Sequence, residues 1–188
     1  MKIFVAGSIR LDFLSPEAME MVKAHIADGS EFLVGDAKGS DRAFQKLLVE
    51  NHYPNVTVFT SATSTRNNLG QWDVYHVPSG LKSAGHASHA IKDRKMSSLA
   101  DAGLMMWDGS STGTLANVLD LLQSGKPCAI AIEGRFKSFQ TLLTEDELSA
   151  LESQLPDVFD EARKRLRQSR KRFQTMVDQY DGLLDLDW

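Results

Sequence analysis

A loop of five small polar residues at 110–114 (SSTGT) has the residue types and the position needed to hold a phosphate. It follows an apolar run at 103–107 and precedes Leu115, Val118 and Leu122, which share one helical face. The order strand, loop, helix places the loop at the carboxyl edge of a parallel sheet, where N–H groups at a helix start favour anions. The expected phosphate-binding residues here are Gly109, Ser110, Ser111, Thr112, Gly113 and Thr114.

The alternative interpretation of this loop is that one hydroxyl simply caps the helix, which Ser110, Ser111 or Thr112 could each do. A cap needs a single hydroxyl, whereas this loop carries several together with glycines on both sides. We therefore favour the ligand-binding interpretation.

Two other loops follow predicted strands and have a similar composition. The first comes after the strand at 2–6, and the second separates the strand at 31–34 from a helix. Their glycines allow close backbone approach to a ligand, although an ordinary βα turn has the same appearance. Because parallel strands end at one edge of a sheet, all three loops should meet there. The binding candidates in these two loops are Gly7, Ser8, Arg10, Gly35, Asp36, Lys38, Gly39 and Ser40.

Strand and helix patterns alternate along the first 132 residues and predict an α/β fold, a Rossmann-like parallel sheet flanked by helices. The segment at 60–87 interrupts this alternation and is expected to be a long functional loop. A helix is expected at about 88–100. The predicted strands are 2–6, 31–34, 56–59, 103–107 and 128–132.

The C-terminal part is expected to be a helical extension at 139–188, following a nucleotide-binding domain at 1–138. Thr144 and Glu147 form a capping box for a helix to about 155, and Asp157 is expected to cap a last helix reaching about 182. This helix carries an apolar stripe, which predicts a homodimer; the alternative is that the helix folds back onto its own chain. The stripe consists of Phe159, Ala162, Leu166, Phe173, Met176, Tyr180 and Leu183.

The other surface of the last helix is basic, which raises a nucleic-acid partner as an alternative. Asp157, Asp160 and Glu161 dilute this charge, and the net charge of the chain is −4, so nucleic acid is not favoured. The basic residues are Arg163, Lys164, Arg165, Arg167, Arg170, Lys171 and Arg172.

Composition excludes several classes of protein. The chain has 188 residues and one cysteine, Cys128, so an internal disulfide or a cysteine-based zinc site is ruled out. No apolar run approaches about 20 residues, so we expect a cytoplasmic protein without a membrane partner. His86 and His89 are three residues apart but lack a third ligand, so no metal site and no cofactor are expected.

Arg94, on the helix at 88–100, is the cation that we expect on the phosphate, with Arg10, Lys38 and Arg66 as lesser candidates. A charged hydrogen bond to phosphate contributes about 1.5–3 kcal/mol. The alternative is that Arg94 lies on a solvated helix face.

Four motifs in order along residues 1–145 resemble a bacterial group within the SLOG superfamily, which includes the LOG phosphoribohydrolases and the DNA-processing protein DprA. They are G-D-x-x-G-x-D at 35–41, R-N-N-x-G-x-W at 66–72, D-R-x-M at 93–96 and W-D-G-x-S-x-G-T-L at 107–115. The resemblance implies a nucleotide or nucleotide derivative as ligand, bound over the loop at 109–114. It adds Asn67, Asp108 and Asn117 to the candidate ligand-binding residues.

The chain departs from the phosphoribohydrolase pattern at two places. Gly109-Ser110-Ser111 replaces Pro-Gly-Gly, and Asn117 stands where the catalytic glutamate would be. Asparagine cannot serve as a base or nucleophile, so cleavage of nucleoside monophosphates by the family mechanism is not expected. The leading prediction is nucleotide binding, with sensing as a suggested role; an N-glycosidase is the alternative. Its candidate catalytic carboxylates are Asp36, Asp41 and Asp108.

Overall fold

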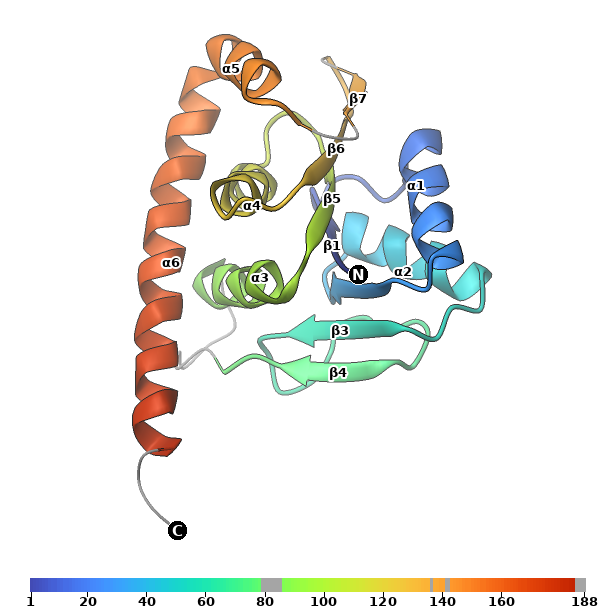
Figure 1. The fold of residues 1–188 in the computed structure, drawn as a ribbon, viewed down its shortest axis with the longest axis vertical. Coiled ribbons are helices and arrows are strands. Elements are labelled where there is room, and N and C mark those ends of the chain that lie inside the picture. Colours follow the sequence, from blue (N-terminus) through green and yellow to red (C-terminus); the bar gives the residue numbers. More distant parts are fainter. Residues whose placement is uncertain (79–85, 136, 141–142, 185–188) are drawn as a thin grey trace.

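The computed structural model describes residues 1–78, 86–135, 137–140 and 143–184, and within them seven strands form one sheet (Figure 1). The strand order is β4-β3-β2-β1-β5-β6-β7, and every neighbouring pair is parallel except β6 and β7. This arrangement confirms the predicted Rossmann-like α/β fold. The strands are β1 (Lys2–Gly7), β2 (Glu31–Gly35), β3 (Val56–Thr60), β4 (Asp73–His76), β5 (Ala102–Trp107), β6 (Cys128–Ile132) and β7 (Ser138–Gln140).

Helices cover both faces of the sheet, and several begin at the predicted caps. The Ser15 hydroxyl accepts the N–H of Ala18 at the start of α1, and Thr144 and Glu147 form the expected capping box of α5. Pro156 is the first residue of α6, so Asp157 lies in the first turn instead of capping the helix as predicted. The helices are α1 (Pro16–Ala27), α2 (Ser40–Glu50), α3 (His86–Leu99), α4 (Thr112–Gln123), α5 (Glu145–Gln154) and α6 (Pro156–Leu184).

Successive side chains of each central strand pack alternately into two separate hydrophobic cores, one on each face of the sheet. Ile3 of β1 packs in a core that α1 and α2 share, whereas Phe4 packs in the core that contains residues of α3, α4 and α6. Because both faces are covered, the central strands read as continuous apolar runs instead of alternating patterns.

The strand order places the topological switch point between β1 and β5. β1 pairs with β2 on one side and with β5 on the other, and the chain builds outward from this pair in both directions. In open α/β sheets, ligands bind at the carboxyl ends of the strands at this point. The fold therefore singles out the loops after β1 and β5.

Two edge strands were not predicted from the sequence. β4 lies within the expected long loop at 60–87 and pairs in parallel with β3, and Tyr75 stacks on Phe59 with ring centroids 5.0 Å apart. β7 has three residues and is antiparallel to β6. β4 is short and no residue in it is buried, so it lacks the apolar run that marks the inner strands.

The apolar stripe of α6 lies against the same chain. Phe159, Ala162 and Leu166 are buried in the core shared with α3 and α4, and Phe173 and Met176 pack against it half-buried. Figure 1 shows α6 running alongside α3 and α4. The side chains of Tyr180 and Leu183 lie outside the described part. The stripe is therefore covered by the same chain as far as Met176, and this part of it gives no reason to expect a dimer. The homodimer stays a prediction.

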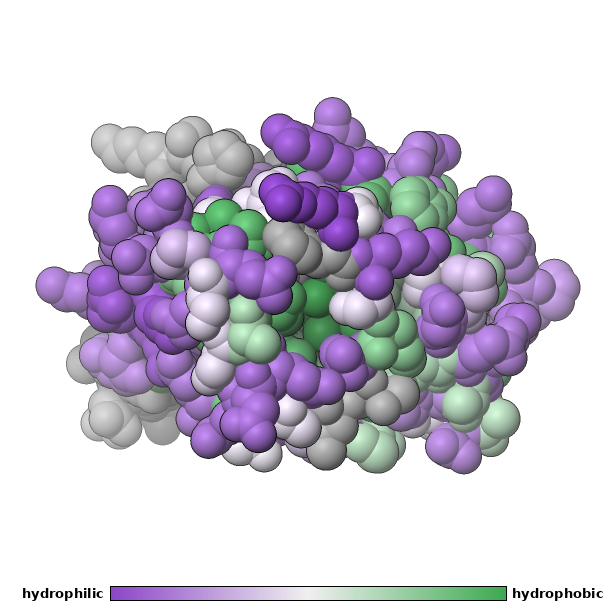
Figure 2. All heavy atoms as spheres, turned by 90° about the horizontal axis from the view of Figure 1, so that it is seen from above, coloured by the Kyte–Doolittle hydropathy of each residue, from purple (hydrophilic) through white to green (hydrophobic). Residues whose placement is uncertain are grey.

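Among the residues that the structure describes, no helix combines the length and apolar character needed to cross a bilayer. Figure 2, which views the molecule from above relative to Figure 1, shows a mostly hydrophilic face with a few apolar residues in a hollow near its centre. The exposed large apolar side chains that can be assigned are scattered along the chain. They are Met1, Ile9, Phe13, Val49, Leu69 and Tyr75.

Candidate functional site

The three βα loops meet around Ser8, which is fully buried at the switch point. Its N–H donates to the Met106 carbonyl at 2.8 Å, and its hydroxyl accepts the N–H of Asp108 at 3.1 Å. The Ser8 hydroxyl lies 3.5 Å from that of Thr114, and its carbonyl accepts the Ser40 hydroxyl at 3.0 Å. One residue therefore ties together the loops after β1, β2 and β5, as predicted from the parallel sheet.

The glycines of these loops let the backbones approach closely. A Cβ on Gly7 would overlap the Met106 carbonyl and the Ser40 hydroxyl, and a Cβ on Gly39, which has φ +75°, would overlap the backbone of Ile9. Both glycines are thus required for the loops to pack together, whatever they bind.

The loop after β5 is ordered by Asp108 and Ser111. Asp108 accepts the N–H groups of Ser110 at 3.0 Å and of Ser111 at 2.8 Å, and the Ser111 hydroxyl caps α4 by accepting the N–H of Thr114. Burial alone would raise the pKa of Asp108, but these hydrogen bonds outweigh it and lower the pKa. The N–H groups of Thr112 and Gly113 come first in α4, where no preceding helical turn supplies a carbonyl.

Asp36 and Arg66 form a second part of the site, beside the end of β2. The Asp36 carboxylate accepts Arg66 Nη2 at 2.6 Å and the Thr60 hydroxyl at 2.9 Å, while the Asn67 amide donates to the Asp36 carbonyl. Burial favours a higher pKa for Asp36, but the hydrogen bonds from Arg66 prevail and lower it. This carboxylate therefore anchors the segment before β4, and Arg66 is already paired with it.

A buried lysine connects this region to α3. Lys92 Nζ lies 3.9 Å from Asp41 and 3.5 Å from Asp93, and a Cβ on Gly35 would overlap both Lys92 Nζ and Asp41. Burial raises the pKa of Asp41 to about 6, and the nearby Asp93 adds to the rise while Lys92 opposes it. One buried ammonium thus serves more than one carboxylate.

Arg94 was predicted as the principal phosphate-binding cation, but most of its guanidinium group contacts other residues of the protein. It is 3% exposed, pairs with Asp120 at 2.9 Å and donates to the Asn117 side chain and the Ala116 carbonyl. Burial lowers its pKa, which Asp120 opposes. Because most of its donors are engaged, Arg94 joins α3 to α4 and is not a free guanidinium at the loop.

The other two candidate cations, Arg10 and Lys38, are exposed. No hydrogen bond or ion pair within the described ranges involves either of them.

His89 contacts Ser61 and Arg66. The described residues contain no group of three or more His, Cys, Asp or Glu side chains arranged for a metal ion.

Sequence reasoning missed Lys92, Asp93 and Arg165 as members of the site. Lys92 is 3% exposed although lysine is normally solvated, so helical spacing alone could not place it inside. Asp93 accepts a hydrogen bond from Asn117 at 3.3 Å, and Arg165 reaches the first turn of α4 from a helix 53 positions later. The D-R-x-M motif was the only signal for Asp93.

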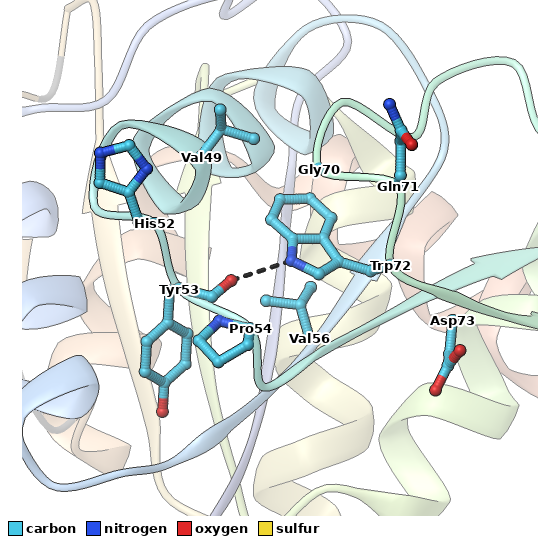
Figure 3. Close-up of a pocket in the computed structure, with 9 residues that line it drawn as sticks. All are labelled: Val49, His52, Tyr53, Pro54, Val56, Gly70, Gln71, Trp72 and Asp73. Atoms are coloured by element: carbon cyan, nitrogen blue, oxygen red, sulfur yellow. Dashed lines mark hydrogen bonds between the residues drawn. The ribbon is translucent and has the colours of Figure 1, made fainter.

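Two pockets in the described structure bear on ligand binding. A small one of about 40 Å³ lies between α3, α4 and α6, and is lined by Asp93, Arg94, Gly113, Asn117 and Arg165 among others. A larger open one of about 510 Å³ lies at the opposite, amino edge of the sheet (Figure 3). It is therefore distant from the loops around Ser8.

Figure 3 shows that the larger pocket is built from the loops before β3 and β4. Trp72 donates its indole N–H to the Tyr53 carbonyl at 2.9 Å, and Val49 and Pro54 contribute apolar surface. Among the described residues that line it, His52 is the one basic side chain, so this lining lacks the charge that phosphate recognition needs.

No family model and no curated protein match the chain. A solved structure of DNA processing protein A from Helicobacter pylori, described for its single-stranded DNA binding mode, resembles it with a TM-score of 0.54 and 14% identity. The alignment covers 84% of this chain and 81% of that one. This likeness shows a DprA-like Rossmann fold and no more.

Proposed function

We propose that the protein binds a nucleotide or nucleotide derivative at the carboxyl edge of the sheet, with its phosphate at the start of α4. The observation that carries the proposal is the convergence of three small-residue loops on Ser8 at the switch point between β1 and β5. The first N–H groups of α4 and the Thr112 hydroxyl, which itself accepts from Arg165, supply the donors, whereas the Ser110 and Thr114 hydroxyls donate to Asp108 and Ser111.

Gly113 gives independent support because the fold does not require a glycine there. It lies in the first turn of α4 without a positive φ, and an added Cβ would make only ordinary contacts with Arg165, at 3.9 Å or more. Glycine in a helix costs about 0.5–1 kcal/mol relative to alanine. A residue that weakens the helix without steric need is consistent with close approach of a ligand to the backbone.

Gly113→Ala is therefore expected to raise the free energy of unfolding by about 0.5–1 kcal/mol while weakening nucleotide binding. Urea unfolding measures the first effect, and calorimetric titration with nucleoside monophosphates, cyclic nucleotides, NAD and ADP-ribose measures the second. Ala24→Gly, at an exposed position inside α1, is the control; it should destabilise its helix without lowering affinity. A stabilised Gly113→Ala variant with unchanged affinity would remove this loop from the site.

The N-glycosidase alternative receives little support from the carboxylates. Asp36 and Asp108 are anchored by hydrogen bonds, Asp41 is buried, and Asn117 faces Arg94 and Asp93. None of the three predicted carboxylates is a free base at the start of α4.

Incubation with nucleoside monophosphates is accordingly expected to release little or no free base, as measured by chromatography. Several turnovers per minute would contradict a purely binding role. In that case Asp93, which lies 3.3 Å from the Asn117 amide, would be the first carboxylate to replace.

Nucleic acid remains the alternative partner, because the DprA structure with the similar fold was described with single-stranded DNA. On α6, however, Arg163 pairs with Glu152 and Arg170 pairs with Asp120, which leaves fewer basic groups facing outward than the sequence implied. Binding of a single-stranded oligonucleotide that falls steeply with salt would favour this alternative.

A further inference from the structure

The junction of α3, α4 and α6 holds more positive than negative charge. Arg94 and Arg170 share a single carboxylate, Asp120, and a third guanidinium group, that of Arg165, lies at the first turn of α4. Arg94 Nη1 lies 2.9 Å and Arg170 Nε 2.6 Å from the Asp120 oxygens. Asp93 also lines the junction and shares Lys92, 3.5 Å away, with Asp41; even with Asp93 counted beside Asp120, the three guanidinium groups outnumber the carboxylates.

Arg165 is the arginine of this group whose charge no described carboxylate neutralises. Its Nη1 donates to the Thr112 hydroxyl at 3.0 Å, and it takes part in no ion pair with a described residue. Its neighbours Arg163 and Arg170 on the same helix both pair with carboxylates. A cation beside the first turn of a helix faces the positive end of the helix dipole, which is unfavourable unless an anion lies between them.

A second observation points to a missing acceptor at the same place. Arg94 is almost completely buried, and its Nε has no hydrogen-bond partner among the residues that the structure describes. Arg94 lines the small pocket together with Gly113, Asn117 and Arg165. The volume of about 40 Å³ exceeds the roughly 10–15 Å³ that one water requires, so the pocket has room for more than one water-sized group.

We propose that this junction is an anion site in which Arg165 of α6 and the first N–H groups of α4 hold a phosphate from opposite sides. The C-terminal helix is then part of the binding site, and an anion bound there joins α6 to α4. The identity of the ligand rests on the proposed function, since the same phosphate chemistry is offered by a nucleotide and by free inorganic phosphate.

The test compares the full-length protein with Arg165→Gln and with the control Arg172→Gln, an exposed arginine on the same helix. Melting curves are recorded in sodium phosphate and in sodium chloride of equal ionic strength. Each variant is also titrated with a nucleoside monophosphate and with its nucleoside. Because each melting temperature in phosphate is referred to the same variant in chloride, any loss of intrinsic stability in Arg165→Gln does not affect the comparison.

We expect phosphate to raise the melting temperature of the wild type and of Arg172→Gln, and to have little effect on Arg165→Gln. The affinity for the monophosphate should fall about tenfold or more in Arg165→Gln, with no change for the nucleoside. An equal response of all three proteins to phosphate, or none, would overturn the anion site.

The remaining outcomes separate this inference from the proposed function. Nucleotide binding that Arg165→Gln leaves unchanged would refute the role of Arg165 and keep the nucleotide site. A phosphate response that depends on Arg165, with no nucleotide bound by the wild type, would support the anion site and refute the nucleotide proposal.

Discussion

Replacing Asp120 with alanine is expected to lower the free energy of unfolding by about 3–5 kcal/mol, the usual cost of leaving a buried charge without its partner. Asp120 is 6% exposed and accepts hydrogen bonds from two arginines, one of which, Arg94, is itself buried. Without this carboxylate, positive charges at the junction of α3, α4 and α6 repel one another and α6 loses an anchor on α4. Urea unfolding of the two proteins measures the difference.

Two further variants show whether the effect comes from the buried charge. Asp120→Asn keeps a hydrogen-bond acceptor but removes the charge, so its loss of stability should be smaller than that of alanine. Glu50→Ala removes an exposed ion pair with Lys46, 3.8 Å apart, and should cost about 1 kcal/mol or less. If Asp120→Ala behaved like Glu50→Ala, the arginines would not depend on Asp120.

Asp41 should make the protein less stable as the pH rises from about 4 to 6. Its pKa is raised from the ordinary 3.8 to about 6 in the folded protein, so between these values the folded state binds more protons than the unfolded state. The stabilisation that protonated Asp41 gives is complete below about pH 4 and lost above about pH 6. The difference between the two pKa values corresponds to a loss of about 3 kcal/mol in the free energy of unfolding between low and neutral pH.

The measurement is the free energy of unfolding of the wild type and of Asp41→Asn between pH 4 and pH 7.5. Asparagine keeps an acceptor for the Ala37 N–H but cannot ionise. The stability of the wild type relative to the variant should therefore fall across this range. Two curves that stay parallel would show that Asp41 does not titrate there, and that Lys92 compensates for its burial completely.

The inner part of the fold could be predicted because both faces of the sheet are covered, so β1, β2, β5 and β6 appear as apolar runs. The capping residues Ser15 and Thr144 were also found correctly. The edge strands β4 and β7 were missed because they are short and are not buried on both faces. The partner of the α6 stripe could not be predicted either, since spacing identifies an apolar face without showing what covers it.

The candidate site was predictable where local sequence decides the geometry. Parallel strands bring their loops to one edge, and Gly7, Ser8, Ser40 and Thr114 meet there as expected. The burial and the ion-pair partners of charged side chains on helices could not be predicted in this way. Arg94 turned out to be paired with Asp120 because of the contact between α3 and α4, and Lys92 is buried by contacts that its own sequence neighbours do not reveal.

The most direct test of the account is a backbone-amide NMR titration of isotope-labelled protein with 5′-AMP, GMP, CMP and UMP in turn. The account predicts that at least one of them shifts the amides of Ser8, Gly109, Thr112 and Gly113 most strongly, in a saturable manner. No shift with any of the four, or shifts confined to the pocket around Trp72, would contradict nucleotide binding at the start of α4.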